Sequence, residues 1–189
     1  DAAGALTAYE TLAGDDRADT ELRIDAALRA ARLHGRRAPF HRDEQVERAR
    51  EREGYQHARE LARALLERGG DDAVRAQGHL ARIDLALGKP NEALASCDAA
   101  LGVTTDAAER VTLRTLRAQI YAVLGDLDEA RRELDGALSD TKDPPADALL
   151  AAADFHTSRR DEAAALPYLR RGVELYPRDE ELGLALVRT

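Results

Sequence analysis

The residues best suited to chemistry in this chain are its histidines and its one cysteine. No histidine lies four residues from another, the spacing that places two metal ligands on one helical face; the histidines are His34, His41, His57, His79 and His156. Cys97 is the single cysteine, so the chain can form no internal disulfide and no thiolate zinc site. Its place in the pattern described below indicates a buried thiol acting as a small apolar side chain. We therefore expect no metal and no cofactor.

The paired aspartates are the next candidates, as a general acid and base. Asp15-Asp16 and Asp71-Asp72 each follow a glycine and precede an apolar, helix-like stretch. Acidic residues in that place are typical of helix starts, where they accept hydrogen bonds from free backbone N–H groups. Gly69-Gly70 lacks the residues of a phosphate-binding loop. No catalytic constellation is visible, so we expect a protein that is not an enzyme.

Charge excludes some classes of partner. The formal net charge is −8, which argues against a nucleic-acid binder because such proteins need a basic surface. Arginines are concentrated in residues 32–52, but glutamates alternate with them, as is typical of a solvated helix face; nucleic acid or acidic lipid is the minor alternative. No apolar run approaches the roughly 20 residues of a membrane span, so we expect no membrane insertion.

Composition indicates a helical core of small side chains. Aromatic residues make up 4% of the chain, and there is no Trp or Met, so the core must consist of Ala, Leu, Val and Ile. Lysine occurs only at Lys89 and Lys142, and this excess of arginine indicates a GC-rich coding sequence and a bacterial source. The chain begins at Asp1 and fits either a trimmed or a processed form. The compartment stays open, with the cytoplasm favoured and a periplasmic or exported mature form as the alternative.

Apolar residues at helical spacing, interrupted by glycine and proline, predict a chain built from helices alone. Gly35 and Pro39 are expected to end the second helix. Gly54 either divides the third helix or lies inside it at a cost of about 1 kcal/mol. The expected ranges are 2–13, 18–33, 42–68, 73–87, 91–101, 106–124, 128–138, 146–156, 161–175 and 180–187.

A repeat organises these helices. The stretch 88–101 has a close copy at 125–138 and a looser one at 160–173. Ala130 follows Ala93 by 37 residues, and Ala165 follows Ala130 by 35 residues. A helix–turn–helix pattern with this period is the mark of an array of helical hairpins. Each hairpin buries part of its apolar surface alone and the remainder against its neighbours.

Three units within residues 73–177 resemble the tetratricopeptide repeat (TPR). The first helix of each unit carries a small residue at Ala81, Ala118 and Ala153, and the second helix carries small residues at Ala93, Ala130, Ala165, Ala100, Ala137 and Gly172. The bulkier position between them is Cys97, Leu134 and Leu169, and the inner turn has Gly88, Gly125 and, departing from the pattern, Arg160. Pro177 matches the closing proline, whereas Thr105 and Lys142 do not. Tyr121 fits the family's aromatic position, which Asp84 and His156 do not.

The resemblance implies where a partner would bind, because in this family the first helix of each unit lines a concave face. Carried over by register, that face would present Arg75, His79, Arg82, Thr112, Thr115, Gln119, Asp147, Leu150 and Asp154. It would grade from basic to acidic and could orient an extended charged segment. The family's clamp for C-terminal carboxylates does not match, although Arg75 and Arg82 could hold a carboxylate. The alternative is a polar, solvated face without a ligand.

These observations predict an all-α, right-handed α-solenoid of about five antiparallel hairpins plus a terminal helix. The expected divisions are degenerate TPR-like hairpins in residues 1–72, three recognisable units in 73–178 and a capping or truncated helix in 179–189. The expected function is a non-enzymatic scaffold that binds another protein or peptide along the groove. The alternative is a regulatory or substrate-recruiting domain cut from a larger enzyme or from a secretion or assembly machine. Self-association through the end hairpins is a third hypothesis.

Overall fold

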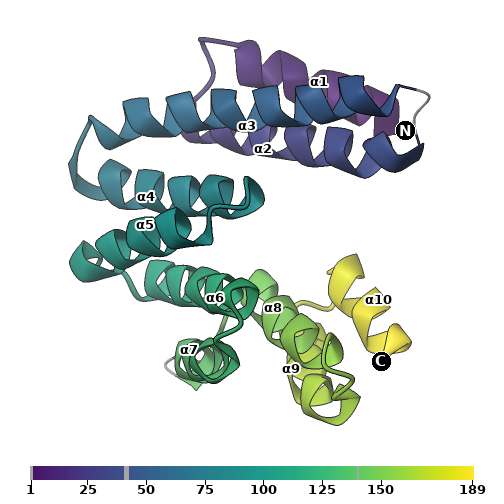
Figure 1. The fold of residues 1–189 in the computed structure, drawn as a ribbon. Helices are drawn as coiled ribbons and strands as arrows, with labels where there is room; N and C mark the ends of the chain where they lie inside the picture. Colours follow the sequence, from purple (N-terminus) through teal and green to yellow (C-terminus); the bar gives the residue numbers. More distant parts are fainter. Residues whose placement is uncertain (1, 41–42, 140) are drawn as a thin grey trace. The chain divides into compact units, whose positions relative to one another are not determined.

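The computed structural model describes residues 2–40, 43–139 and 141–189, and these residues form helices and connecting turns without a strand (Figure 1). The α-helices are α1 (Ala2–Gly14), α2 (Thr20–Arg37), α3 (Glu44–Leu66), α4 (Gly70–Ala86), α5 (Pro90–Val103), α6 (Ala107–Leu124), α7 (Leu127–Ser139), α8 (Ala146–Thr157), α9 (Glu162–Leu175) and α10 (Glu180–Arg188). A short 3₁₀ helix, η1 (Ala38–Phe40), follows α2. The all-α class predicted from the sequence is confirmed.

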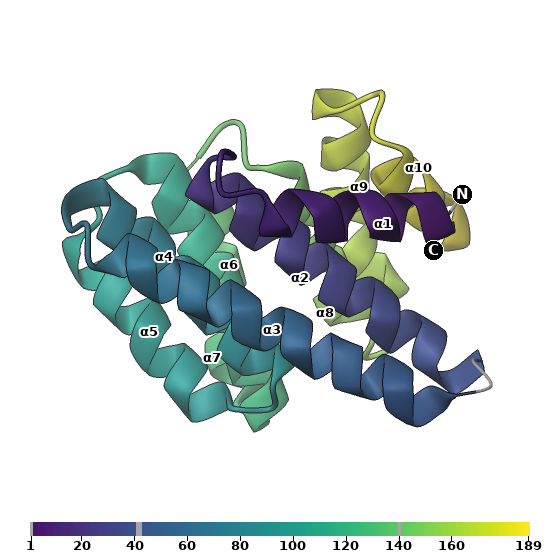
Figure 2. The same ribbon diagram turned by 90° about the horizontal axis from the view of Figure 1, so that it is seen from above.

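The helices form two compact units, Asp1–Ala100 and Leu101–Thr189. In the first unit, α2 packs against both α1 and α3, and α3 packs against α4 (Figure 2). Alanines alternate there with larger apolar side chains such as Ile24, Leu65 and Ile83. In the second unit, α6 pairs with α7, α8 pairs with α9, and α8 also contacts α6 and α10. Leu149 and Leu169 lie in the core of that unit.

The repeated small residues occupy equivalent places in the core. Ala93, Ala130 and Ala165 all have an exposed fraction of 0%. Gly172 stands where the first two units have Ala100 and Ala137, and a Cβ there would collide with the side chain of Leu182 on α10. Small side chains at these points allow two helices to approach closely enough for their neighbours to interlock. The predicted register of the repeat is therefore confirmed by burial.

Two glycines lie inside helices where the sequence suggested breaks. Gly54 lies within the continuous helix α3. A Cβ at this position would come within 2.9 Å of the Cβ of Ala31 on α2, so only glycine fits there without a shift. Gly35 lies within α2, where a Cβ would collide with the carboxylate of Glu51. The expected helix end at Gly35 is wrong, because close packing against α3 offsets the helical cost of glycine. Because α3 is not divided, the described residues up to Leu66 form three α-helices, α1, α2 and α3, and α2 packs against both of the others.

The inner turns share one hydrogen-bonded geometry. The N–H groups of Lys89, Asp126 and Asp161 donate to the carbonyl oxygens of Asp84, Tyr121 and His156 at 2.8, 2.9 and 3.1 Å. This bond closes a helix when the preceding residue adopts the left-handed conformation. Gly88 and Gly125 do so with φ of 72° and 90°, and Arg160 does so with φ of 60°. The residue that departs from the sequence pattern thus keeps the backbone of the pattern.

We predict that Arg160→Gly stabilises the protein by about 0.5–1 kcal/mol, because the left-handed conformation strains a residue with a Cβ and does not strain glycine. Urea unfolding measures the change. Gly125→Ala provides the converse control. No atom lies within 4 Å of the added Cβ, so the only cost is the strain of a left-handed backbone at a residue with a Cβ. That variant should lose about 1 kcal/mol. Equal stability of Arg160→Gly and the wild type would contradict the proposed strain.

Candidate functional site

A pocket of about 310 Å³ opens between α6 and α8 in the second unit. Its floor is mainly apolar and its rim carries a few polar groups; it is lined by Ala118, Gln119, Ala122, Val123, Leu134, Ala151, Asp154, Phe155, Ser158 and Arg159. Val123 has an exposed fraction of 64%, which is high for a large aliphatic side chain. An apolar hollow with a small number of convergent polar groups is the usual form of a binding site.

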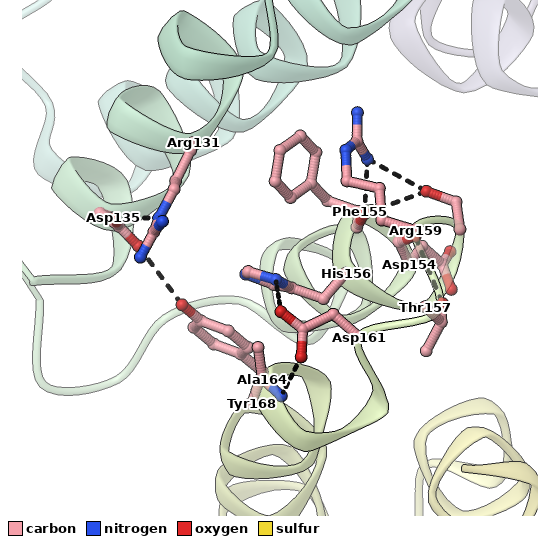
Figure 3. A network of polar contacts seen from close by, with 11 residues as sticks. Arg131, Asp135, Asp154, Phe155, His156, Thr157, Arg159, Asp161, Ala164 and Tyr168 are labelled. Atoms are coloured by element: carbon pink, nitrogen blue, oxygen red, sulfur yellow. Dashed lines mark hydrogen bonds and ion pairs between the residues drawn. The ribbon is translucent and has the colours of Figure 1, made fainter.

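Phe155 and Arg159 form one end of this pocket (Figure 3). They lie four residues apart on and just after α8, and the guanidinium carbon of Arg159 is 3.8 Å from the centre of the Phe155 ring. The same guanidinium donates to the carbonyl oxygen of Phe155 and, at 3.1 Å, to the hydroxyl of Ser158. These contacts hold a cation over an aromatic ring. A planar, exposed guanidinium of this kind is well suited to binding a carboxylate.

Gln119 and Asp154 are the polar groups contributed by α6 and α8 themselves. Partial burial beside the apolar floor raises the pKa of the Asp154 carboxyl above its ordinary value. Gln119 is exposed and can both donate and accept hydrogen bonds. Together they offer an incoming main chain acceptors for its N–H groups and a donor for its carbonyl groups.

A second cluster of side chains joins α8 to α9 and α9 to α7 behind the pocket (Figure 3). The rings of His156 and Tyr168 are stacked with centres 5.6 Å apart, and Phe155 meets His156 edge to face at 5.3 Å. The Tyr168 hydroxyl donates to Asp135 at 3.3 Å. Burial, together with the Asp135 carboxylate, raises the pKa of Tyr168. These contacts fix the ring of Phe155 from its outer side.

The structure brings together only part of the site predicted for the second unit. Gln119 and Asp154 line the pocket, as described above. Thr115 is buried, and its hydroxyl donates to the Val111 carbonyl oxygen at 2.8 Å, so it is engaged within its own helix. Thr112 is partly exposed and donates to Ala108 at 3.2 Å. Asp147 is exposed, and Leu150 packs against the core of its unit.

The remaining predicted residues lie on α4 in the first unit. Arg75 is exposed and forms an ion pair with Glu21 at 2.8 Å. Arg82 is partly exposed. His79 is only 9% exposed, and its Nδ1 atom has no hydrogen-bond partner. Burial, and secondarily the charge of Arg82, lower the pKa of His79, so the ring is neutral at physiological pH.

Phe155, Ser158 and Arg159 are the site residues that sequence reasoning missed. The spacing of Phe155 and Arg159, four residues apart on a helix, does predict contact between them. That signal was available, but the repeat pattern placed the aromatic position one residue later, at His156.

Other sequence expectations concern residues away from the pocket. In the arginine-rich segment, Arg48 pairs with Glu44 at 3.7 Å and with Glu51 at 3.2 Å, as a solvated helix face requires. His41 and Arg42 lie outside the described residues. Within residues 2–40, 43–139 and 141–189, no group of three or more metal-ligating side chains is placed to hold an ion. In the same part of the chain, no helix has both the length and the apolar character needed to cross a membrane.

The fold defines the class of protein. Paired antiparallel helices with buried small residues at equivalent crossings are the architecture of a TPR protein. The structure is similar to the crystal structure of YrrB, described as a TPR protein with an unusual peptide-binding site, with a TM-score of 0.52 and 18% sequence identity over 96% of this chain and 98% of that one. No protein-family model matches the sequence, and no curated protein matches it. The resemblance to the TPR fold is thus shown by the structure.

We predict that Asp154→Asn raises stability at neutral pH, because the folded protein disfavours the charged carboxyl whose pKa is raised. Above the folded pKa, the wild type bears the cost of a partly desolvated charge that the amide lacks. As the pH falls through the folded pKa, the wild-type carboxyl takes up a proton and the advantage of the variant disappears. Urea midpoints at neutral and acidic pH measure the difference. A larger advantage at acidic than at neutral pH would contradict this assignment.

Proposed function

We propose that this protein is a non-enzymatic interaction module that binds a peptide or helix of another protein, and that the pocket between α6 and α8 holds one of the partner's side chains. The observation that carries this proposal is the exposed apolar pocket itself, with a guanidinium at one end. Exposed apolar surface is costly in water, so its retention beside convergent polar groups indicates a surface that is covered by a partner. TPR architecture, with helices that present one long face, supports the same function.

The chemistry of the pocket indicates a partner segment with an aliphatic or aromatic residue next to a carboxylate. The apolar residue fits the floor formed by Ala118, Ala122 and Leu134. The carboxylate of the partner would meet Arg159, whose exposed guanidinium forms no ion pair with an acidic residue in the described part of the second unit. Hydrogen bonds from the partner's main chain go to Gln119 or Asp154. Such a segment satisfies both the apolar and the charged parts of the site.

Each unit, taken by itself, also has candidate partner-binding residues. In the first unit they are Arg75, His79 and Arg82 of α4, and in the second unit they are Thr112, Thr115, Asp147 and Leu150. Among these, the exposed residues Arg75 and Asp147 are best placed to reach a partner directly. The buried residues His79 and Thr115 would instead support the helices that carry them.

Selection of short random peptides displayed on phage against the wild-type protein tests the proposal. We expect selected peptides to combine an apolar residue with an adjacent Asp or Glu. Val123→Trp narrows the pocket from its exposed rim and should weaken these peptides about tenfold in fluorescence anisotropy, since a central apolar contact is typically worth 1–2 kcal/mol. Arg159→Glu should weaken the acidic peptides by a similar factor.

Val187→Trp is the matched control, because Val187 is also an exposed valine in the second unit, with an exposed fraction of 86%, but does not line the pocket. It should leave peptide affinity unchanged. Circular dichroism confirms that both tryptophan variants fold. If no peptide is selected, or if selected peptides bind Val123→Trp as tightly as the wild type, the pocket is not the binding site.

A further inference from the structure

A buried histidine in the first unit lies between two carboxylates from different helices. His34 on α2 is 3% exposed. Its Nδ1 atom is 2.6 Å from Oε2 of Glu47 on α3, and its Nε2 atom is 2.9 Å from Oε1 of Glu10 on α1. One imidazole ring thus connects three helices. The side chain of Glu47 is 1% exposed, whereas that of Glu10 is 51% exposed.

While both glutamates are ionised, the two contacts are both hydrogen bonds only if the ring is protonated. A carboxylate is only an acceptor, so both ring nitrogens must donate, and only the imidazolium carries a proton on each. The neutral ring has one N–H, and its other nitrogen presents a lone pair to a negatively charged oxygen. Because Glu47 is buried and cannot turn to water, the remaining proton is needed at Nδ1. The contact that fails on deprotonation is therefore the one to Glu10.

Among the described residues, the charged and titratable groups that line the hollow beside His34 are Glu10 of α1 and Arg50, Glu53 and His57 of α3. Arg50 lies 3.6 Å from Oε1 of Glu47 and partly balances its charge. Glu51 lies against the backbone of Gly35, next to His34, and is paired with Arg48 at 3.2 Å. The segment η1 (Ala38–Phe40) has no titratable side chain. From α1, Glu10 is the charged residue that contacts the ring.

Other contacts that hold α1 keep their apolar partners or their hydrogen-bond donors whether or not a histidine ring is charged. Leu6 and Ala13 are buried, and Tyr9 and Leu12 pack against the core of the unit. At the end of α1, the Ala13 carbonyl oxygen accepts hydrogen bonds from Nε of Arg23 at 3.1 Å and from Nε2 of His57 at 3.2 Å. Arginine stays charged, and a neutral histidine can keep its proton on Nε2.

We propose that His34 is a proton-controlled latch for α1. While the ring is protonated, it ties α1 to α2 and α3 through Glu10 and Glu47. When the ring is neutral, the tie to Glu10 is lost and the docking of α1 weakens. Glu10, Ala13 and Gly14 of α1 line one side of a hollow of about 490 Å³, and the buried residues Ala27, Ala30 and Ala31 of α2 also line it. Release of α1 therefore uncovers the alanine face of α2.

Amide hydrogen exchange read by mass spectrometry tests this latch in the full chain. Protection factors, corrected for the intrinsic effect of pH on exchange, are compared for α1 and α4 in the same samples. We expect the ratio of α1 to α4 protection to fall about tenfold from acidic to mildly alkaline pH, because the ring loses one of its two N–H donors. Dividing the α1 protection factor by that of α4 removes the effect of any change in the stability of the whole unit. A wild-type ratio that stays constant overturns the proposal.

Two variants separate the latch from the other contacts of α1. Glu10→Gln replaces the half-exposed carboxylate by an amide, which can accept a hydrogen bond from the charged ring or donate one to the neutral ring. The ratio of α1 to α4 protection in this variant should therefore change less than about twofold with pH, whatever its absolute value. His57→Gln lowers α1 protection at every pH but should keep the tenfold fall. If the protection ratio of Glu10→Gln still falls tenfold, or if that of His57→Gln no longer falls, the pH dependence belongs to another group and the latch is overturned.

Discussion

Close approach of helices at small side chains is the constraint on which this structure depends. Ala93, Ala130 and Ala165 are inaccessible to solvent, and at Gly172 even a methyl group would collide with Leu182. Larger residues at these crossings would separate the helices and expose the leucines packed beside them. The pocket between α6 and α8 is itself lined by small residues of these two helices, Ala118, Ala122 and Ala151. Packing and the candidate site are thus two consequences of the same pattern.

The sequence predicted the fold well because the repeat is a local signal. The predicted helix ends lie within a few residues of those observed, except near two glycines that were expected to end or divide a helix. Gly54 and Gly35 both lie inside helices, and the reason is a contact with a residue on another helix: Ala31 for Gly54 and Glu51 for Gly35. No pattern within α3 alone reports that contact. Arg160 shows the reverse case, in which the residue type departs from the repeat while the turn keeps its hydrogen bond and positive φ.

The site was predictable only in part, because a pocket depends on two helices that are distant in sequence. Register placed Gln119 and Asp154 on the correct sides of α6 and α8, and both line the pocket. It could not show that Thr115 is covered by neighbouring helices or that His79 is buried, since the assignment of faces assumes that every first helix is exposed to the same depth. Phe155 and Arg159 complete the site through their stacking, which is a property of side chains and not of the repeat.

Buried polar pairs have a particular role in a core made largely of alanine. Alanine surfaces are smooth, so neighbouring helices can pack in adjacent registers with similar burial of apolar area. His34 with Glu47, and Arg59 with Asp84 at 3.1 Å, join successive helices of the first unit through carboxylates that are at most 5% exposed. Loss of His34 or Arg59 would leave a buried carboxylate without that partner, a change that typically costs about 3–5 kcal/mol. Each pair therefore disfavours a shift of one helix along its neighbour that would separate the two partners.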